Sequence, residues 1–405
     1  MQVRFQNGIA PANSDLFASQ HATEKGLIKT KSGLMVPGTT LFSGQWAGQH
    51  SAAANPRESM AKHAQRLGFD GVGPCTWAGQ FNVIKAACDP GLAKAMLDDY
   101  ALGGQLMRPT HIEGHIAGQM TLTPSEIIRL SPESYGGLAA EYSPLAEAIT
   151  NGAWDDINEI ALKYQIDLVQ AAANAEVDTV IGFLGSNIWH LFYRFPDCGK
   201  DIDAGYKHAA KFIQPLLKKC ADTGVAFALE VHPTEIAFDY QTLLRFVEEL
   251  EAVDKTTAKM FKVNVDPSHF IKQGIDPAAV LRKLPVELLR RIHIKGAAYN
   301  LGRMASPQRN GNLDSALNSM LPYGDLNRGS DFKVAGDEIE ATGIDWANFY
   351  EAIRQHEMLK FQTRELEFEV TSEDWDSAAG RSRYDINSYR RAINQQGKFD
   401  DWEKK

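Results

Sequence analysis

Cysteine is scarce in this sequence, and its spacing excludes two common kinds of small site. The 405 residues contain four cysteines, Cys75, Cys88, Cys198 and Cys220. None of them lies in a C-x-x-C spacing, so the sequence predicts neither a zinc knuckle nor a redox-active pair. We expect reduced thiols in a cytoplasmic protein.

Long apolar runs and surplus positive charge are also missing. No stretch approaches the roughly 18 consecutive apolar residues that span a bilayer. The opening residues, MQVRFQNGIAPANSDLF, have no apolar signal-peptide core, so we expect no membrane partner. The 42 Lys and Arg residues against 51 Asp and Glu give a net charge of −9. A protein that binds nucleic acid commonly has an excess of positive charge, which this sequence lacks, so we expect no nucleic-acid partner.

Several catalytic motifs cannot be found either. The glycine pairs at 103–104 and 136–137 lack the strand–GxGxxG–helix context of a dinucleotide site. The sequence has no G-x-S-x-G, no P-loop and no H-E-x-x-H. These absences exclude the common hydrolase, kinase and zinc-protease classes.

Short apolar segments instead alternate with helical patterns along most of the chain, which favours βα units and a parallel sheet. Eight such segments predict strands, at residues 38–45, 69–75, 105–114, 179–184, 225–231, 261–265, 291–295 and 365–370. Because eight strands close a parallel α/β barrel, we predict a single (β/α)8 TIM barrel over residues 38–395. Residues 1–37 are predicted as an N-terminal extension, and residues 396–405 as a C-terminal tail.

Helices and loop insertions complete the prediction. Helical patterns cover residues 56–67, 83–102, 154–175, 206–223, 240–253, 277–282, 346–356 and 384–394. Residues 119–150 contain three prolines and are predicted as a loop that caps the mouth of the barrel. Residues 296–342 form a second long insertion. From the two long insertions and the terminal extensions we expect a homo-oligomer.

Acidic and histidine residues stand at the ends of the last four predicted strands. The buried run VAFALEVHP (225–233) ends near Glu230, and Asp266, His293 and Glu367 hold matching places in later strands. The carboxyl ends of barrel strands meet at one mouth. Three carboxylates and one imidazole suit hard or borderline ions such as Mn²⁺, Mg²⁺ or Co²⁺. The alternative is that each residue caps a helix or bonds a loop; Glu369 is a second candidate for the place of Glu367.

Further residues near strand ends are candidates for substrate contact. His269 and His232 could hydrogen-bond a substrate or act as acid and base, or could be structural histidines. Lys295 could polarise a carbonyl or hold a phosphate, or could neutralise the surplus carboxylates. The third predicted strand ends near His111 and His115. Four aromatic residues could form a wall against a sugar ring or belong to the core: Trp46, Trp77, Phe81 and Trp189.

These motifs resemble a known family. EVHPTEIAFD (230–239), NVDPSHF (264–270), HIK (293–295) and LEFEV (366–370) are similar to xylose isomerase-like barrels of the sugar phosphate isomerase/epimerase type. GQW (44–46), HIAGQ (115–119), GFLGSNIWHLFYRFP (182–196) and GDLNRGSDF (324–332) extend the resemblance over nearly the whole chain.

The resemblance implies a divalent metal, with Mn²⁺ first and Mg²⁺ or Co²⁺ as alternatives, held by Glu230, Asp266, His293 and Glu367. It implies that Glu230 and Glu367 also move protons, and that His269 is a ligand or a substrate contact. We predict Glu230, Glu367 and His269 as catalytic residues. The predicted substrate-binding residues are His115, His232, Trp46, Trp189 and Lys295.

The expected function is therefore a metal-dependent sugar isomerase or epimerase that moves a proton beside a carbonyl through an enediolate. Its expected partner is a small sugar or keto-sugar. The first alternative is a 3-keto-glycoside lyase or hydrolase that works by β-elimination at the same metal site. An endonuclease of the AP type and a non-catalytic sugar-binding barrel are further alternatives, and the acidic charge balance argues against the endonuclease.

Overall fold

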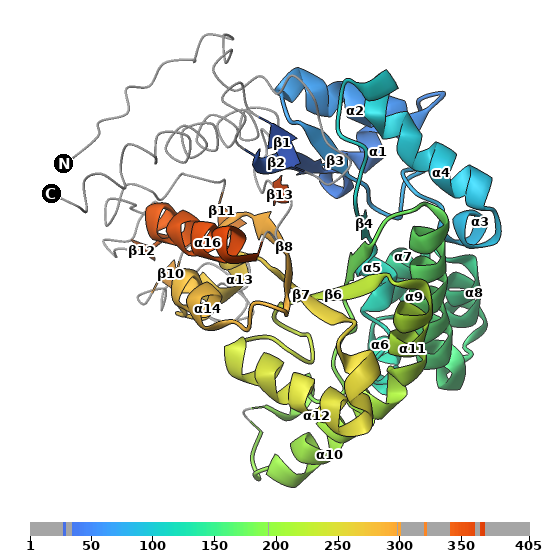
Figure 1. Cartoon of the computed structure of the whole chain (residues 1–405). Helices are drawn as coiled ribbons and strands as arrows, with labels where there is room; N and C mark the ends of the chain where they lie inside the picture. Colours follow the sequence, from blue (N-terminus) through green and yellow to red (C-terminus); the bar gives the residue numbers. More distant parts are fainter. Residues whose placement is uncertain are drawn as a thin grey trace, which may run out of the picture.

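The fold is a mixed α/β arrangement built on one curled, mainly parallel sheet (Figure 1). The computed structural model describes residues 27–29, 35–192, 194–297, 299–300, 320–321, 341–360 and 365–368. Nine strands make up the sheet: β1 (Leu27–Lys29), β2 (Met35–Phe42), β3 (Gly71–Gly73), β4 (Ile112–Glu113), β5 (Thr179–Gly182), β6 (Ala226–Glu230), β7 (Phe261–Val265), β8 (Leu289–Ile294) and β13 (Glu365–Phe368).

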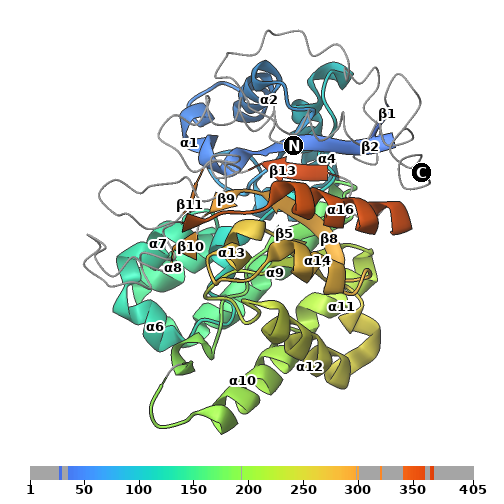
Figure 2. The ribbon, with the colours of Figure 1, turned by 90° about the vertical axis from the view of Figure 1, so that its left-hand side faces the viewer.

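Strand pairing follows the chain around the sheet. The strands run in the order β2, β13, β8, β7, β6, β5 and β4, all parallel, while β3 pairs parallel with β2 and β1 pairs antiparallel with it. Figure 2 shows β13 between β2 and β8. The first and the last of the predicted strands are thus neighbours in one curled sheet, and the predicted parallel sheet is confirmed.

The strands β3 and β4 also meet, just beyond the end of β3. An isolated parallel bridge joins Cys75 to Glu113. The Glu113 amide donates to the Pro74 carbonyl at 2.8 Å, and the Thr76 amide donates to the Glu113 carbonyl at 3.2 Å. This bridge brings the end of β4 close to the ends of the other strands.

Helices surround the outer side of the sheet (Figure 1). They are α1 (Ala47–His50), α2 (Pro56–Leu67), α3 (Val83–Cys88), α4 (Pro90–Asp98), α5 (His115–Gly118), α6 (Ser125–Leu130), α7 (Pro132–Ala139), α8 (Ser143–Asn151), α9 (Ile157–Asn174), α10 (Gly199–Phe212), α11 (Gln214–Thr223), α12 (Tyr240–Ala258), α13 (Pro267–Ile271), α14 (Pro277–Lys283) and α16 (Trp346–Lys360). Short 3-10 helices lie at η1 (Ser43–Gln45), η2 (Asp99–Gly104), η3 (Trp154–Asp156) and η4 (Trp189–Leu191).

Helix α9 packs against α3 and α11, and α14 packs against α16. Strand residues such as Phe227, Val263 and Ile292 are fully buried in the resulting core.

Helix α2 shows how local sequence sets these boundaries. The Asn55 side chain accepts hydrogen bonds from the amides of Arg57 and Glu58, and Pro56 occupies the first turn, where no amide donor is needed. The helix ends at Gly68, whose φ of 82° is a left-handed conformation that favours glycine. The predicted range of 56–67 is confirmed.

Two predicted helices are each divided by a proline. The predicted helix 83–102 is broken at Pro90, where the Asp89 side chain caps a new helix by accepting from the Leu92 amide. The predicted helix 206–223 is broken before α11, which has Pro215 in its first turn. A proline is tolerated in the first turn of a helix and disrupts its interior.

The prediction of a loop at residues 119–150 is wrong. This segment contains the three helices α6, α7 and α8. The prolines of this segment led to the prediction of a loop, because proline is common in turns. Pro132 and Pro144 instead lie in the first turns of α7 and α8. Leu145, Ala148 and Ile149 of α8 are buried in the core. The segment is therefore a packed helical layer.

Part of the second insertion consists of two small antiparallel pairs. Strand β9 (Gly296–Ala297) pairs with β11 (Met320–Leu321), and β10 (Tyr299–Asn300) pairs with β12 (Ala341–Thr342). The predicted helix 384–394, the tail 396–405 and most of the extension 1–37 lie outside the described residues. Within the described part of the chain, none of the helices has the length and apolar character needed to cross a membrane.

Candidate metal centre

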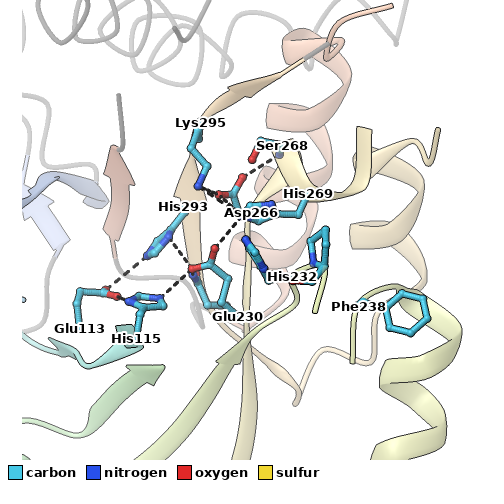
Figure 3. Close-up of polar contacts among 12 residues, drawn as sticks. Glu113, His115, Glu230, His232, Phe238, Asp266, Ser268, His269, His293 and Lys295 are labelled. Atoms are coloured by element: carbon cyan, nitrogen blue, oxygen red, sulfur yellow. Dashed lines mark hydrogen bonds and ion pairs between the residues drawn. The ribbon is translucent and has the colours of Figure 1, made fainter. Parts of the chain in front are cut away.

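Three adjacent strands bring two carboxylates and one imidazole together. Glu230 is the last residue of β6, Asp266 follows β7, and His293 lies in β8. All three side chains are buried, and one ligand atom from each lies within 4.8 Å of the others. Figure 3 shows them converging. Because β6, β7 and β8 are parallel neighbours, their polar ends meet as the sequence predicts.

The Glu230 carboxylate is the hub of the site. Its Oε2 lies 3.1 Å from His293 Nδ1 and 2.9 Å from His115 Nε2, and it accepts from Asn264 Nδ2 at 3.1 Å. Its Oε1 lies 3.0 Å from His269 Nε2. Burial alone raises the pKa of Glu230, but the surrounding imidazoles outweigh burial and hold that pKa well below its usual range.

His293 has the complementary shift. Burial lowers the pKa of this imidazole, but the carboxylates of Glu230 and Glu113 more than offset it and raise the pKa well above its usual value. The site therefore stabilises positive charge next to Glu230. A divalent cation can supply that charge in place of imidazole protons, because metal binding releases protons from its ligands.

Asp266 is fixed from two sides. Its Oδ1 accepts from the Ser268 amide at 2.8 Å at the start of α13, and its Oδ2 lies 2.7 Å from Lys295 Nζ. His269 Nε2 is 3.2 Å from the same Oδ2. Burial raises the pKa of Asp266, but Lys295 and His269 hold it below its usual range. Lys295 is therefore a counter-ion to Asp266, which is one of the three roles considered for it.

The two candidate histidines lie side by side on the same flank of Glu230. The rings of His232 and His269 are 4.1 Å apart, edge to face, and the Phe183 ring lies 4.9 Å from His232. His269 is buried, while His232 is partly exposed. Burial and the neighbouring His269 hold the pKa of His232 well below its usual value. His232 is therefore neutral near pH 7.

Glu113 belongs to the same cluster and was missed in the sequence. It ends β4, where its Oε1 lies 2.9 Å from His111 Nε2 and 3.5 Å from His293 Nε2. Its Oε2 lies 3.2 Å from His115 Nδ1. The predicted third strand ended near His111 and His115, with Glu113 between them in HIEGH. The rule that selected the other strand-end carboxylates selects Glu113 as well.

His115 connects the Glu113 side of the site to Glu230. Its ring is in edge contact with Phe183, with centroids 4.8 Å apart. Burial lowers the pKa of His115, but the charges of Glu113 and Glu230 more than offset burial and raise it.

The remaining predicted site residues fall into three groups. Glu367 lies in β13, in register with His293 and Thr40; its side chain and all of Glu369 are outside the described part of the chain. Trp46 is fully buried in the core, with its ring 5.9 Å from His63. Trp189 is partly exposed in η4 and contacts Phe238 edge to face at 4.9 Å.

The donor set fits a divalent cation. Glu230 and Asp266 offer carboxylate oxygens and His293 offers an imidazole nitrogen, a set that suits Mn²⁺, Mg²⁺ or Co²⁺ better than a thiolate metal. The 3.1 Å between Glu230 Oε2 and His293 Nδ1 is compatible with two ligands of one ion at bond lengths of about 2.1 Å. The identity of the metal stays a prediction.

A further buried carboxylate, Glu235, fixes the loop beside the site. It is fully buried, and its Oε2 accepts from the amides of Leu184 and Gly185 at 2.7 and 2.8 Å. Its Oε1 has no hydrogen-bond partner among the described residues. Burial raises the pKa of Glu235 to about 8, although the two amides oppose this shift.

This shift predicts a pH-dependent loss of stability. The folded state holds the Glu235 proton more tightly than the unfolded chain, so its contribution is fully present below pH about 4.5 and is lost as pH rises through about 8. Glu235→Gln stays neutral at every pH. We expect the variant to lose less unfolding free energy than the wild type between pH 5 and 9, measured by urea denaturation. Parallel pH profiles for the two proteins would contradict the assignment.

Comparison with known proteins places the chain in a family. The sequence model of the xylose isomerase-like TIM barrel matches residues 148–388. Because this match covers more than half of the chain, the protein belongs to the xylose isomerase-like TIM barrel family. No sequence among curated proteins matches it.

Solved structures share the fold at low sequence identity. L-ribulose 3-epimerase has a TM-score of 0.52 and 13% identity, covering 90% of this chain and 98% of that chain. The 3-keto-D-glucoside 4-epimerase YcjR from E. coli has a TM-score of 0.50 and 13% identity, with 86% and 98% covered. The probable 3-DHS dehydratase AsbF from Bacillus anthracis has a TM-score of 0.51 and 13% identity, with 85% and 97% covered. At these identities the likeness shows the fold alone.

Proposed function

We propose that this protein is a divalent-metal-dependent sugar isomerase or epimerase. One observation carries the proposal: Glu230 belongs to a buried metal-type donor group and also contacts two imidazoles outside that group, His115 and His269. A carboxylate so placed can both hold a cation and exchange a proton. The epimerases among the structural neighbours are consistent with this proposal.

The proposed chemistry is proton transfer beside a carbonyl. A divalent ion held by Glu230, Asp266 and His293, with Glu367 as the proposed fourth ligand, would polarise the carbonyl of the substrate. Glu230 would remove the proton from the neighbouring carbon, which leaves an enediolate. A protonated Glu367 would then give its proton to the opposite face of that carbon in an epimerase, or to the former carbonyl carbon in an isomerase. Glu230 would release its proton to solvent and Glu367 would regain one there before the next turnover. His269 donates a hydrogen bond to a substrate hydroxyl, and Lys295 keeps Asp266 ionised.

The proposal also covers the substrate, the complete fold, the oligomeric state and the location of the protein in the cell. Its substrate is a small sugar or keto-sugar, contacted by His115, His232 and Trp189. The eight parallel strands form a (β/α)8 barrel behind an N-terminal extension, and the chain acts as a homo-oligomer in the cytoplasm. The ring of Trp46 is fully buried in the core. A contact between Trp46 and the substrate stays a prediction.

Product analysis tests the reaction class. The metal-loaded protein is incubated with ketoses, aldoses and 3-keto-glycosides, and the products are identified by NMR and mass spectrometry. We expect a product of the same mass as its substrate. Release of an aglycone or of a dehydrated sugar would show that the reaction is β-elimination and not isomerisation. No product from any member of the panel would contradict the proposed function.

A further inference from the structure

A second group of metal-type ligands lies beside the first. Glu113 at the end of β4, His115 in α5 and His293 in β8 each offer an atom within 4.8 Å of the other two. Their relative exposures are 0, 5 and 0%. Figure 3 shows Glu113 and His115 on the opposite side of His293 and Glu230 from Asp266 and Lys295. The two groups therefore share His293, while Glu113 and His115 lie apart from Asp266.

The distances within this group are those between ligands of one ion. Glu113 Oε2 lies 3.2 Å from His115 Nδ1, and Glu113 Oε1 lies 3.5 Å from His293 Nε2. Two tetrahedral ligands with bonds of about 2.1 Å lie roughly 3.4 Å apart. Charge-assisted hydrogen bonds are shorter, about 2.7–2.9 Å. The contact of His111 Nε2 with Glu113 Oε1, at 2.9 Å, has the hydrogen-bond length.

Two buried ligand atoms of this group have no hydrogen-bond partner among the described residues. They are His115 Nδ1 and Glu113 Oε2, which lie 3.2 Å apart. On the other side of the His115 ring, Nε2 lies 2.9 Å from Glu230 Oε2, a hydrogen-bond distance. A cation bound between His115 Nδ1 and Glu113 Oε2 would give both atoms a partner.

His111 contacts Glu113 and orients its carboxylate. Its Nε2 donates to the Glu113 oxygen that also faces His293. Hydrogen bonds from outer residues commonly orient a metal-binding carboxylate. His111, Glu113 and His115 occupy alternate positions of HIEGH, so one short segment supplies two ligands and the residue that orients one of them.

His293 serves both groups through opposite ring nitrogens. Its Nδ1 faces Glu230 at 3.1 Å, and its Nε2 faces Glu113 at 3.5 Å. Each ring nitrogen of His293 could therefore be a ligand to a different ion, in which case His293 would bridge the two ions as an imidazolate.

We propose that Glu113, His115 and His293 form a second cation site, which shares His293 with the first. Two imidazoles and one carboxylate with an open fourth position suit Zn²⁺ and similar borderline ions. The first site has more oxygen ligands and suits harder ions. The second site goes beyond the proposed function, because proton transfer by Glu230 requires only the first.

Metal counting tests this proposal without reference to activity. Purified protein is stripped of metal, and Zn²⁺ or Co²⁺ is added while binding is followed by calorimetry and, for Co²⁺, by visible absorption. We expect two equivalents for the wild type, one with the strong absorption of four-coordinate Co²⁺. Glu113→Gln should lose that absorption and weaken the corresponding equivalent on the order of 100-fold, since it removes a charged ligand. Asp266→Asn should retain that absorption.

Three outcomes are distinguishable. One equivalent in the wild type, or two in Glu113→Gln with unchanged absorption, would overturn the second site and leave the proposed function intact. No bound metal at all would contradict both. If circular dichroism shows that Glu113→Gln does not fold, His115→Gln provides the same test, and retention of both equivalents there overturns the proposal.

Discussion

Glu230→Gln is expected to lower kcat by at least about 10³-fold on any substrate that the wild type converts. The substitution keeps the shape of the side chain but removes its basicity and one charged metal ligand, and general-base catalysis alone contributes on the order of 10²–10⁴-fold. Glu230 is also the common partner of His115, His269 and His293. Steady-state kinetics at saturating metal, together with a measured metal affinity, separate the loss of the base from the loss of the ligand.

Glu235→Gln is the matched control for this experiment. Glu235 is another buried glutamate, in the segment that follows β6, but it accepts from the backbone amides of Leu184 and Gly185. The glutamine oxygen can accept from those amides, so we expect kcat within a few-fold of the wild type. Wild-type turnover in Glu230→Gln, or equal losses in both variants, would remove Glu230 from the mechanism.

Asp266→Asn should lose both metal binding and stability. The substitution removes a metal-binding carboxylate and leaves Lys295 Nζ, 2.7 Å away, without that partner in a buried position. Removing one member of a buried ion pair costs about 3–5 kcal/mol. We expect a fall of that order in the free energy of unfolding, measured in urea on metal-free protein, and at least about a 100-fold loss of affinity for the first equivalent of metal.

The double variant Asp266→Asn/Lys295→Met separates the two effects. Methionine removes the buried charge and retains most of the side-chain volume, so stability should recover most of the loss. Metal affinity should not recover, because the ligand is still absent. If metal affinity returned with stability, Asp266 would act on the fold and not as a ligand.

Much of the fold could be predicted from the sequence because its strands are fully buried. Strand β7 (Phe261–Val265) and helix α2 (Pro56–Leu67) were predicted with their observed bounds. Strand β7 alternates apolar and polar residues (FKVNV) with the period of a strand, and helix α2 begins after the capping Asn55 and ends before Gly68. Each pattern leaves few alternative structures. The helical segment at 119–150 was not predicted, because proline predicts a turn until its position within a helix is known. Pro132 and Pro144 stand where a helix tolerates proline.

The candidate site shows a similar division. Glu230, Asp266 and His293 could be predicted because each lies at or next to the end of a segment with a clear strand pattern. Glu113 ends a strand of only two residues, β4, whose position depends on the bridge to Cys75 and on pairing with β5. Contacts of this kind join residues far apart in the sequence. The position of Glu113 at a strand end makes it a candidate, but no local pattern reveals that it meets His293, 180 residues later.

Solvent hydrogen exchange tests the central claim most directly. Substrate is incubated in D₂O with protein that is metal-loaded, EDTA-treated, or EDTA-treated and reloaded, and deuterium is located by NMR. Metal-dependent proton transfer by Glu230 predicts deuterium on the carbon beside the carbonyl, its loss with EDTA, its return on reloading, and its absence with Glu230→Gln. Exchange that is unaffected by EDTA, or absent from every sugar and keto-sugar tested, would contradict the account.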